Sequence, residues 1–220
     1  MLAFHEKFVL LTINDEKGNI APGYVKTLGF AGALLLELAE KNLITTEGKT
    51  IVCSAQTADS AILNSAIEIL KSAKKPMKTA TALQKIANKL YKQFDKVIEG
   101  LIEKEILRLE EKKVLWLFKV KHYPTKNSEP ENLIKSRIKG IVLYGNQTDN
   151  ESLNLIGLIH ALNLHKEIFT KEEMKQAKTK IKELISNETV AKEISRIIQQ
   201  QITAAVIAST VAASAASSTN

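Results

Sequence analysis

The feature that most constrains the fold is a helical spacing of apolar residues, which recurs through most of the chain. In residues 23–41 apolar side chains return every three or four positions, which predicts a helix. A second helix is predicted to start after Asp59 or Ser60 as N-cap and to stop before Pro76. The same spacing predicts helices at residues 79–106, 133–143, 153–164 and 171–184.

Two of these helices are followed by a predicted β-hairpin. Residues 43–45 and 50–53 are expected to pair around a turn at 46–49, and residues 107–109 and 114–118 around the polar run 110–113. At a constant offset of 63, residues 38–53 align with residues 101–116, which indicates a weak internal repeat. The fold class that follows is mainly α, a compact helical domain with two or more short β-hairpins.

The positive charge is concentrated in the middle of the chain. The formal net charge is +7, and residues 71–126 hold 15 Lys plus Arg against 6 Asp plus Glu. A basic segment of this kind suits an anionic partner such as a membrane surface or nucleic acid. With one cysteine and no signal-peptide pattern near the start, the protein is expected to be cytoplasmic.

The C-terminal part of the sequence has a different composition. No charged residue follows Arg196, and residues 197–220 are mostly Ala, Ser, Thr, Ile and Val. Three consecutive glutamines and many hydroxyl side chains argue against a membrane span. We expect one domain at residues 1–196, then an Ala/Ser-rich C-terminal helix and frayed tail at 197–220.

No combination of residues indicates catalysis, so we expect no catalytic residue, no cofactor and no metal site. His160 and His165 would lie about 140° apart on one helix, which separates them as ligands, and His160 is expected near the core. Gly29 and Gly32 are predicted to permit close helix packing instead of binding phosphate. Cys53 is predicted to be a small buried hydrophobe.

Four lysines form the sharpest candidate binding feature. If residues 79–106 form one helix, Lys85, Lys89, Lys92 and Lys96 fall within a sector of about 60°, opposite an apolar face. A solvated helix face is the simpler interpretation, but further lysines at residues 71–78 favour an anion-facing surface. At a bilayer of acidic lipid, each lysine near the surface contributes about 1 kcal/mol.

Nucleic acid would use the same charges, and a helix followed by a hairpin also describes a winged helix. In this alternative, Lys112 and Lys113 would form the tip of the wing and contact phosphate. The lysine-rich segment has few side chains suited to bidentate base contacts, with Gln93 the best placed and Arg108 beyond the helix. Nucleic acid is therefore a partner only under this second hypothesis.

The order of motifs resembles the Golgi phosphoprotein 3 family. The resemblance covers roughly residues 7–169 and rests on six motifs with similar gaps: an acidic-glycine turn at 14–18, G-A-L-L-L-E-L-A at 32–39, a helix start at 57–67, L-I-E-K-E-I-L at 101–107, Leu117-Phe118 and Tyr123-Pro124. No single motif is diagnostic, but their shared order makes coincidence improbable.

The resemblance implies a compact, mostly helical domain that binds phosphatidylinositol 4-phosphate on membranes, and in eukaryotic members acts as a Golgi adaptor that retains glycosyltransferases. In our alignment the family's Trp and three basic pocket positions are occupied here by Pro22, Ala31, Tyr91 and Phe94, as in a divergent prokaryotic member.

We therefore expect a non-catalytic peripheral membrane protein that binds acidic phospholipid or phosphoinositide-like headgroups with a looser headgroup choice. The expected headgroup-binding residues are Lys26, Lys85, Lys89, Lys92 and Lys96. A role as an adaptor and a homo-oligomeric state are further expectations.

Overall fold

The computed structural model describes residues 1–14, 18–21, 23–54, 57–114, 118–185, 194 and 196–197. Within these residues the protein is mainly α-helical, with two small antiparallel sheets, as predicted. The helices are α1 (Phe4–Leu10), a π-helical turn (Val25–Gly29) that leads into α2 (Phe30–Glu40), α3 (Ala61–Lys71), α4 (Thr79–Leu90), α5 (Gln93–Glu103), α6 (Glu129–Tyr144), α7 (Asn150–Ala161), a 3-10 turn (His165–Glu167) and α8 (Met174–Ile185).

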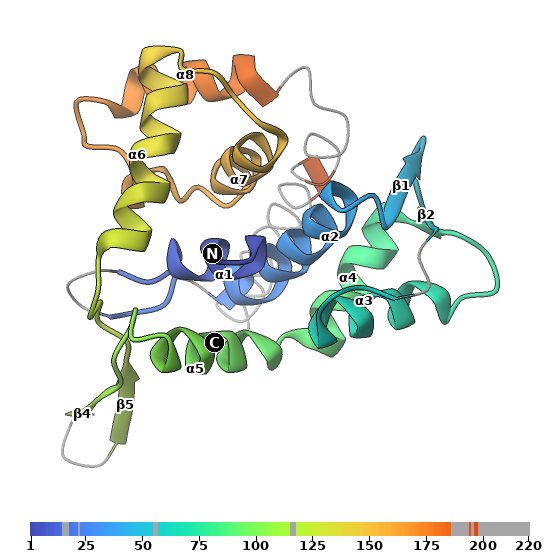
Figure 1. The fold of residues 1–220 in the computed structure, drawn as a ribbon, viewed down its shortest axis with the longest axis horizontal. Helices are drawn as coiled ribbons and strands as arrows, with labels where there is room; N and C mark the ends of the chain where they lie inside the picture. The colour runs from blue at the N-terminus through green and yellow to red at the C-terminus, as the bar shows by residue number, and fades with distance from the viewer. Residues whose placement is uncertain are drawn as a thin grey trace, which may run out of the picture.

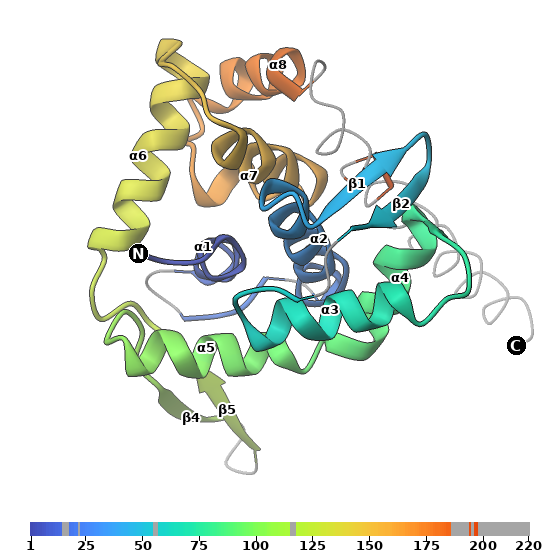
Figure 2. The same ribbon diagram turned by 45° about the vertical axis from the view of Figure 1, so that its right-hand side comes forward.

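Helix α2 lies at the centre of the molecule (Figure 1). Every residue from Phe30 to Leu38 is buried, as expected of a helix that is apolar on all sides and enclosed by others. The helices α1, α3, α4 and α7 all pack against it. In both ribbon views α6 and α8 lie on one side of α2, and the first hairpin with α4 lies on the other (Figures 1 and 2).

The internal repeat corresponds to two helix ends with the same hydrogen bonds. After α2, Asn42 adopts a left-handed φ of 56° and the Leu43 amide donates to the carbonyl of Leu38 at 2.9 Å. After α5, Glu105 has a φ of 58° and the Ile106 amide donates to the carbonyl of Leu101 at 3.0 Å. Both ends have this Schellman-type C-terminal hydrogen bond, which satisfies an otherwise unpaired helix carbonyl. The offset of 63 thus matches these two helix ends. Helix α7 ends in the same way, with the Leu164 amide donating to the Ile159 carbonyl at 2.9 Å, so the repeat itself stays a prediction.

The first predicted hairpin is confirmed, and the second is displaced. Strands β1 (Ile44–Glu47) and β2 (Thr50–Cys53) pair around Gly48, and β2 also pairs with a short β3 (Met77–Lys78) that the sequence did not predict. The second hairpin consists of β4 (Glu110–Val114) and β5 (Phe118–His122). The run 110–113, predicted as its turn, is therefore strand.

The predicted single helix at 79–106 is wrong, because the chain breaks between α4 and α5 at Tyr91 and Lys92. There the Phe94 amide donates to the Tyr91 carbonyl three residues back, at 3.3 Å. The break allows Phe94 to be fully buried with its ring edge-to-face on Phe30, at a centroid distance of 5.5 Å. Packing therefore outweighs the continuous helical pattern.

Two further differences concern the chain ends. The helix α1 was not predicted, since its short apolar run carries no clear period. The helix predicted at 197–220 lies outside the described residues except for Ile197, which is buried. The boundary at residue 196 therefore stays a prediction. Among the described residues, no helix is both long and apolar enough to cross a membrane.

Candidate functional site

The four predicted lysines project from α4 and from the start of α5. Lys85 and Lys89 are exposed on α4, Lys92 is the N-cap residue of α5, and Lys96 is exposed one turn further on. In the described part of the chain, no carboxylate forms an ion pair with any of them. We call these four residues the lysine surface. Because the helix is broken, they belong to two helices and do not form one straight ridge.

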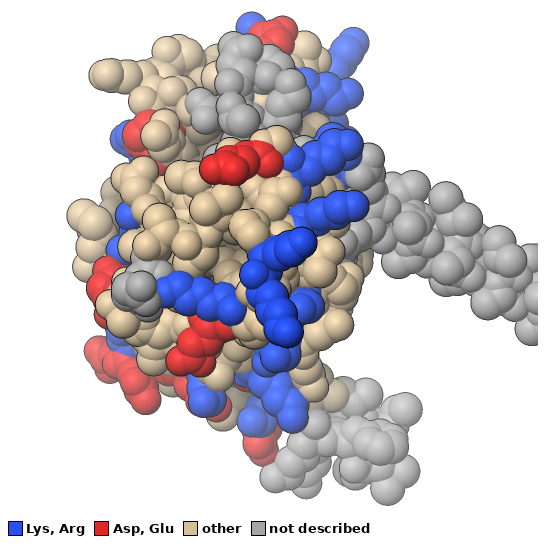
Figure 3. Space-filling model, turned by 90° about the vertical axis from the view of Figure 1, so that its right-hand side faces the viewer, with Lys and Arg blue, Asp and Glu red and all other residues tan. Residues whose placement is uncertain are grey.

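The structure adds a neighbouring group of lysines that the sequence had not connected. The amide and hydroxyl of Thr79, the first residue of α4, donate to the carbonyl of Lys49 at 2.8 and 3.0 Å. The turn of the first hairpin thus lies beside Lys78 and the basic segment that contains Lys74 and Lys75, all of them exposed. Lysine and arginine side chains gather in a band over this side of the molecule (Figure 3).

Lys26, the fifth predicted headgroup ligand, is held by an acidic neighbour. Its Nζ donates to both carboxylate oxygens of Asp95, at 2.6 and 2.8 Å, and lies 5.7 Å from the centre of the Phe94 ring. Its charge is therefore largely compensated within the protein. The structure brings Lys26 close to α5, but not as an unpaired cation.

The positions aligned with the family's headgroup pocket do not form a basic pocket here. Ala31 and Phe94 are only 1% and 0% exposed, so both lie in the hydrophobic core. Tyr91 is 40% exposed, and Lys92 Nζ lies 6.0 Å from the centre of its ring. Pro22 lies outside the described residues. The four aligned positions therefore supply no positive charge in this chain.

The structure brings together the two histidines that the sequence separated. Helix α7 ends at Ala161 and Asn163 has a left-handed φ of 57°, so His165 does not continue the helix of His160. Their rings meet with Nδ1 of His160 3.0 Å from Nε2 of His165. Burial, with the nearby charge of Lys178, lowers the pKa of both rings, that of His165 to about 4. Both rings are therefore neutral near pH 7.

Gly29 and Cys53, two other residues with sequence predictions, lie in or against the hydrophobic core. A Cβ on Gly29 would lie 2.7 Å from side-chain atoms of Phe8 and Leu162, so this glycine permits close helix packing as predicted. Cys53 is half-buried and packs against the core. Among the described residues, no group of three or more His, Cys, Asp or Glu side chains could hold a metal ion.

The structure does not place Lys112 and Lys113 where the winged-helix hypothesis requires them, at the tip of the second hairpin. Lys112 and Lys113 lie within β4, where their backbones pair with Val120 and Lys119, so they are not at the turn. The prediction that these two residues form the tip of the hairpin is therefore wrong, and a phosphate contact stays a prediction.

Together, these observations define a class: a mainly helical domain with a broad, unpaired basic surface. A family model of Golgi phosphoprotein 3 (GPP34) matches residues 4–201, which is most of the chain. The protein belongs to the Golgi phosphoprotein 3 family, as the motifs indicated. No curated protein matches the chain significantly.

Proposed function

We propose that this protein is a peripheral membrane protein that binds acidic phospholipid headgroups through the lysine surface, without a chemical step. The observation that carries the proposal is that Lys85, Lys89, Lys92 and Lys96 are exposed and unpaired within the described chain. Elsewhere in the described part of the chain, ion pairs bring lysine, arginine or histidine together with carboxylates. The three lysines within residues 74–78 beside this surface are also exposed and form no ion pair with a described residue, so the unpaired positive charge extends over neighbouring segments, as an anionic partner would require.

Membership in the Golgi phosphoprotein 3 family supports a membrane partner. The burial of Ala31 and Phe94 supports a headgroup choice looser than selection of one phosphoinositide. Lysine is a flexible point charge and does not form the fixed bidentate contacts of arginine. We therefore place phosphatidylinositol 4-phosphate among several acidic lipids that the protein binds.

The expected strength follows from the charges. Four lysines near an acidic surface contribute about 4 kcal/mol, which corresponds to about a thousandfold in affinity. Because the Debye length is about 8 Å at physiological ionic strength, this binding should weaken as salt is added.

Vesicle co-sedimentation with and without acidic lipid tests the proposal. A variant with Lys85, Lys89, Lys92 and Lys96 changed to Glu should lose binding, at a stability cost within about 0.5 kcal/mol for each exposed site. The matched control changes four exposed lysines near and on α8 to Glu, and therefore has the same net charge: Lys166, Lys171, Lys175 and Lys178.

The proposal requires that the control variant keep most of its binding. Equal loss in the two variants would show that net charge, and not the lysine surface, drives association. Preferential binding of duplex DNA over acidic vesicles at the same salt concentration would instead support the nucleic-acid hypothesis. Binding that persists at high salt would contradict an electrostatic contact.

A further inference from the structure

An exposed aromatic ring adjoins the lysine surface at the break between α4 and α5. Tyr91 is 40% exposed, although Leu90 before it and Phe94 three residues later are buried. Tyr91 is the C-cap residue of α4, and Lys92 is the N-cap residue of α5. The break that buries Phe94 therefore leaves Tyr91 on the outside of the molecule, next to a member of the lysine surface.

The ring of Tyr91 lies beside a cation that no described carboxylate pairs with. Lys92 Nζ is 6.0 Å from the centre of the ring, at the outer limit of a cation–π contact. In the part of the chain that the structure describes, neither the Tyr91 hydroxyl nor the Lys92 ammonium group has a hydrogen-bond partner. Apolar surface, a hydroxyl and a positive charge are thus available together at this place.

The only other exposed ring among the described aromatic residues is that of Tyr144, at the end of α6. In both ribbon views α6 lies on the opposite side of α2 from α4 (Figures 1 and 2). An exposed ring alone is ordinary on a protein surface. Tyr91 differs from Tyr144 because its ring coincides with unpaired positive charge.

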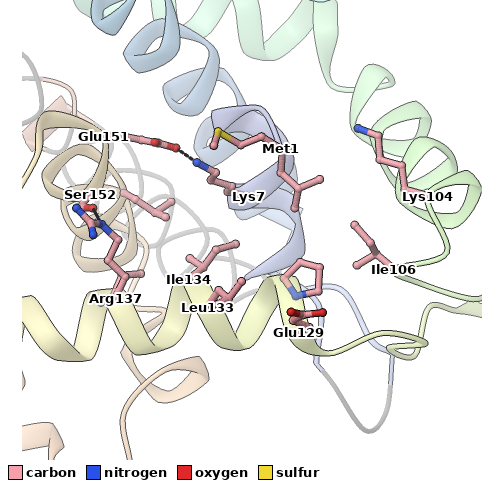
Figure 4. Close-up of a pocket in the computed structure, with 14 residues that line it drawn as sticks. Met1, Lys7, Lys104, Ile106, Glu129, Leu133, Ile134, Arg137, Glu151 and Ser152 are labelled. Carbon is pink, nitrogen blue, oxygen red and sulfur yellow. Dashed lines mark hydrogen bonds and ion pairs between the residues drawn. The ribbon is translucent and has the colours of Figure 1, made fainter.

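Exposed apolar surface elsewhere lies beside charges that are already paired. A hollow of about 640 Å³ between α1, α6 and α7 is lined by Leu133, which is 65% exposed (Figure 4). The three cationic side chains in its described lining all pair with carboxylates: Lys7 with Glu151, Lys104 with Glu6 and Arg137 with Asp149. This hollow therefore offers no free positive charge to an acidic partner, whereas Lys92 does.

A ring next to an ammonium group fits a bilayer better than an anion in solution. At the boundary of a bilayer, an aromatic ring lies between headgroups and acyl chains while its hydroxyl stays in the polar layer. A lysine side chain reaches lipid phosphates in the same layer. A soluble polyanion such as heparin satisfies the lysine but gives the ring no hydrocarbon surface.

We propose that Tyr91 is the interfacial anchor of the lysine surface, with its ring between the headgroups and acyl chains of an acidic bilayer while Lys92 contacts lipid phosphate. This inference rests on the proposed membrane binding and adds that the partner is the bilayer itself, and not a headgroup in solution. If about 40 Å² of ring surface leaves water, affinity rises about fivefold. Unlike the contribution of the lysines, this gain is not screened by salt.

The affinity of the full chain for vesicles of phosphatidylcholine and phosphatidylserine tests the inference. Tyr91→Ala should bind about fivefold more weakly than the wild type, by the same factor at low and at moderate salt, and Tyr91→Phe should bind like the wild type. The matched control Tyr144→Ala removes a ring that is 76% exposed and should bind normally. Heparin should bind Tyr91→Ala and the wild type equally, which also shows that the variant is folded.

Fluorescence quenching reports the position of the side chain directly. Trp116 is the only tryptophan of the sequence, so Tyr91→Trp in a Trp116→Phe background has a single indole fluorophore. Phosphatidylcholine brominated near the start of its acyl chains should quench this fluorophore when the vesicles also contain acidic lipid. Tyr144→Trp in the same background should stay unquenched.

The inference is overturned if Tyr91→Ala keeps the wild-type affinity for vesicles, if Tyr144→Ala loses as much, or if brominated lipid leaves Tyr91→Trp unquenched. A loss of heparin binding equal to the loss of vesicle binding overturns it as well. A larger loss for single-stranded DNA than for vesicles would assign the ring to base stacking instead.

The variant with four Glu residues in the lysine surface separates this inference from the proposed function. If that variant loses vesicle binding and Tyr91→Ala does not, membrane binding stands and the anchor fails. If the wild type does not bind acidic vesicles, both fail.

Discussion

Gly29 and Gly100 offer a direct comparison of helix packing. Both lie in helical segments, and Gly29 has an ordinary helical φ of −62°. A Cβ at Gly29 would come within 2.7 Å of Leu162 Cδ1 and Phe8 Cζ, whereas a Cβ at Gly100 meets no atom within 4 Å. Leu162 and Phe8 are 1% and 0% exposed, so neither can move into solvent to relieve the contact.

Changing each glycine to alanine should therefore affect the stability of the protein by different amounts. Both changes gain up to about 1 kcal/mol from the greater helix propensity of alanine, and this common gain cancels when the two variants are compared. What remains is the overpacking at Gly29, which costs about 1–3 kcal/mol. Gly29→Ala should thus be less stable than Gly100→Ala by this amount.

Thermal unfolding followed by circular dichroism measures the difference. In a chain of this size, each kcal/mol corresponds to some 2–4 °C in Tm. Gly100→Ala should melt at or above the wild-type temperature, and Gly29→Ala below that of Gly100→Ala. If the two variants have the same Tm, Phe8 and Leu162 do not crowd the position of Gly29.

Three further predictions concern charged and titrating groups. Glu37→Ala should destabilise the protein in denaturant unfolding by about 1–3 kcal/mol for each donor left unsatisfied, because buried Glu37 accepts from the ring and the amide of His5 at 2.6 and 3.1 Å; a loss below about 1 kcal/mol would contradict this. Asp95→Asn should free Lys26 and tighten binding to acidic vesicles about fivefold, or about 1 kcal/mol, whereas unchanged affinity would place Lys26 away from the lipid. Since the pKa of His165 is lowered to about 4, the unfolded chain takes up a proton at higher pH than the folded chain does. The free energy of unfolding should therefore fall as pH decreases from about 6.5 to about 4. His165→Asn should reduce the slope of Tm against pH, and an unchanged slope would refute the lowered pKa.

The sequence predicted helix ends well where a local hydrogen-bond pattern sets them. Ser60 was one of two expected N-caps, and its side chain accepts from the Leu63 amide at 3.4 Å. Leu38 and Leu101 occupy equivalent positions before two left-handed residues, and their carbonyls make equivalent bonds. Such signals lie within a few residues of each other, so they can be recognised without knowledge of the fold.

Tertiary packing decided the features that the sequence did not reveal. Neither Gly nor Pro marks the break at Tyr91 and Lys92, which arises from the contact of Phe94 with a distant helix. The second hairpin consists of mostly polar residues, so alternation gave no register. Its position follows instead from long-range pairing, as in the bond from the Arg108 amide to the Pro124 carbonyl at 3.0 Å.

The candidate site was predictable in its residues but not in its geometry. The exposure of Lys85 and Lys89 follows from the helical period of α4 alone. The pairing of Lys26 with Asp95 joins residues 69 apart in sequence, and no local pattern could show it. Local sequence thus identifies which lysines are exposed, and the fold determines which of them remain unpaired.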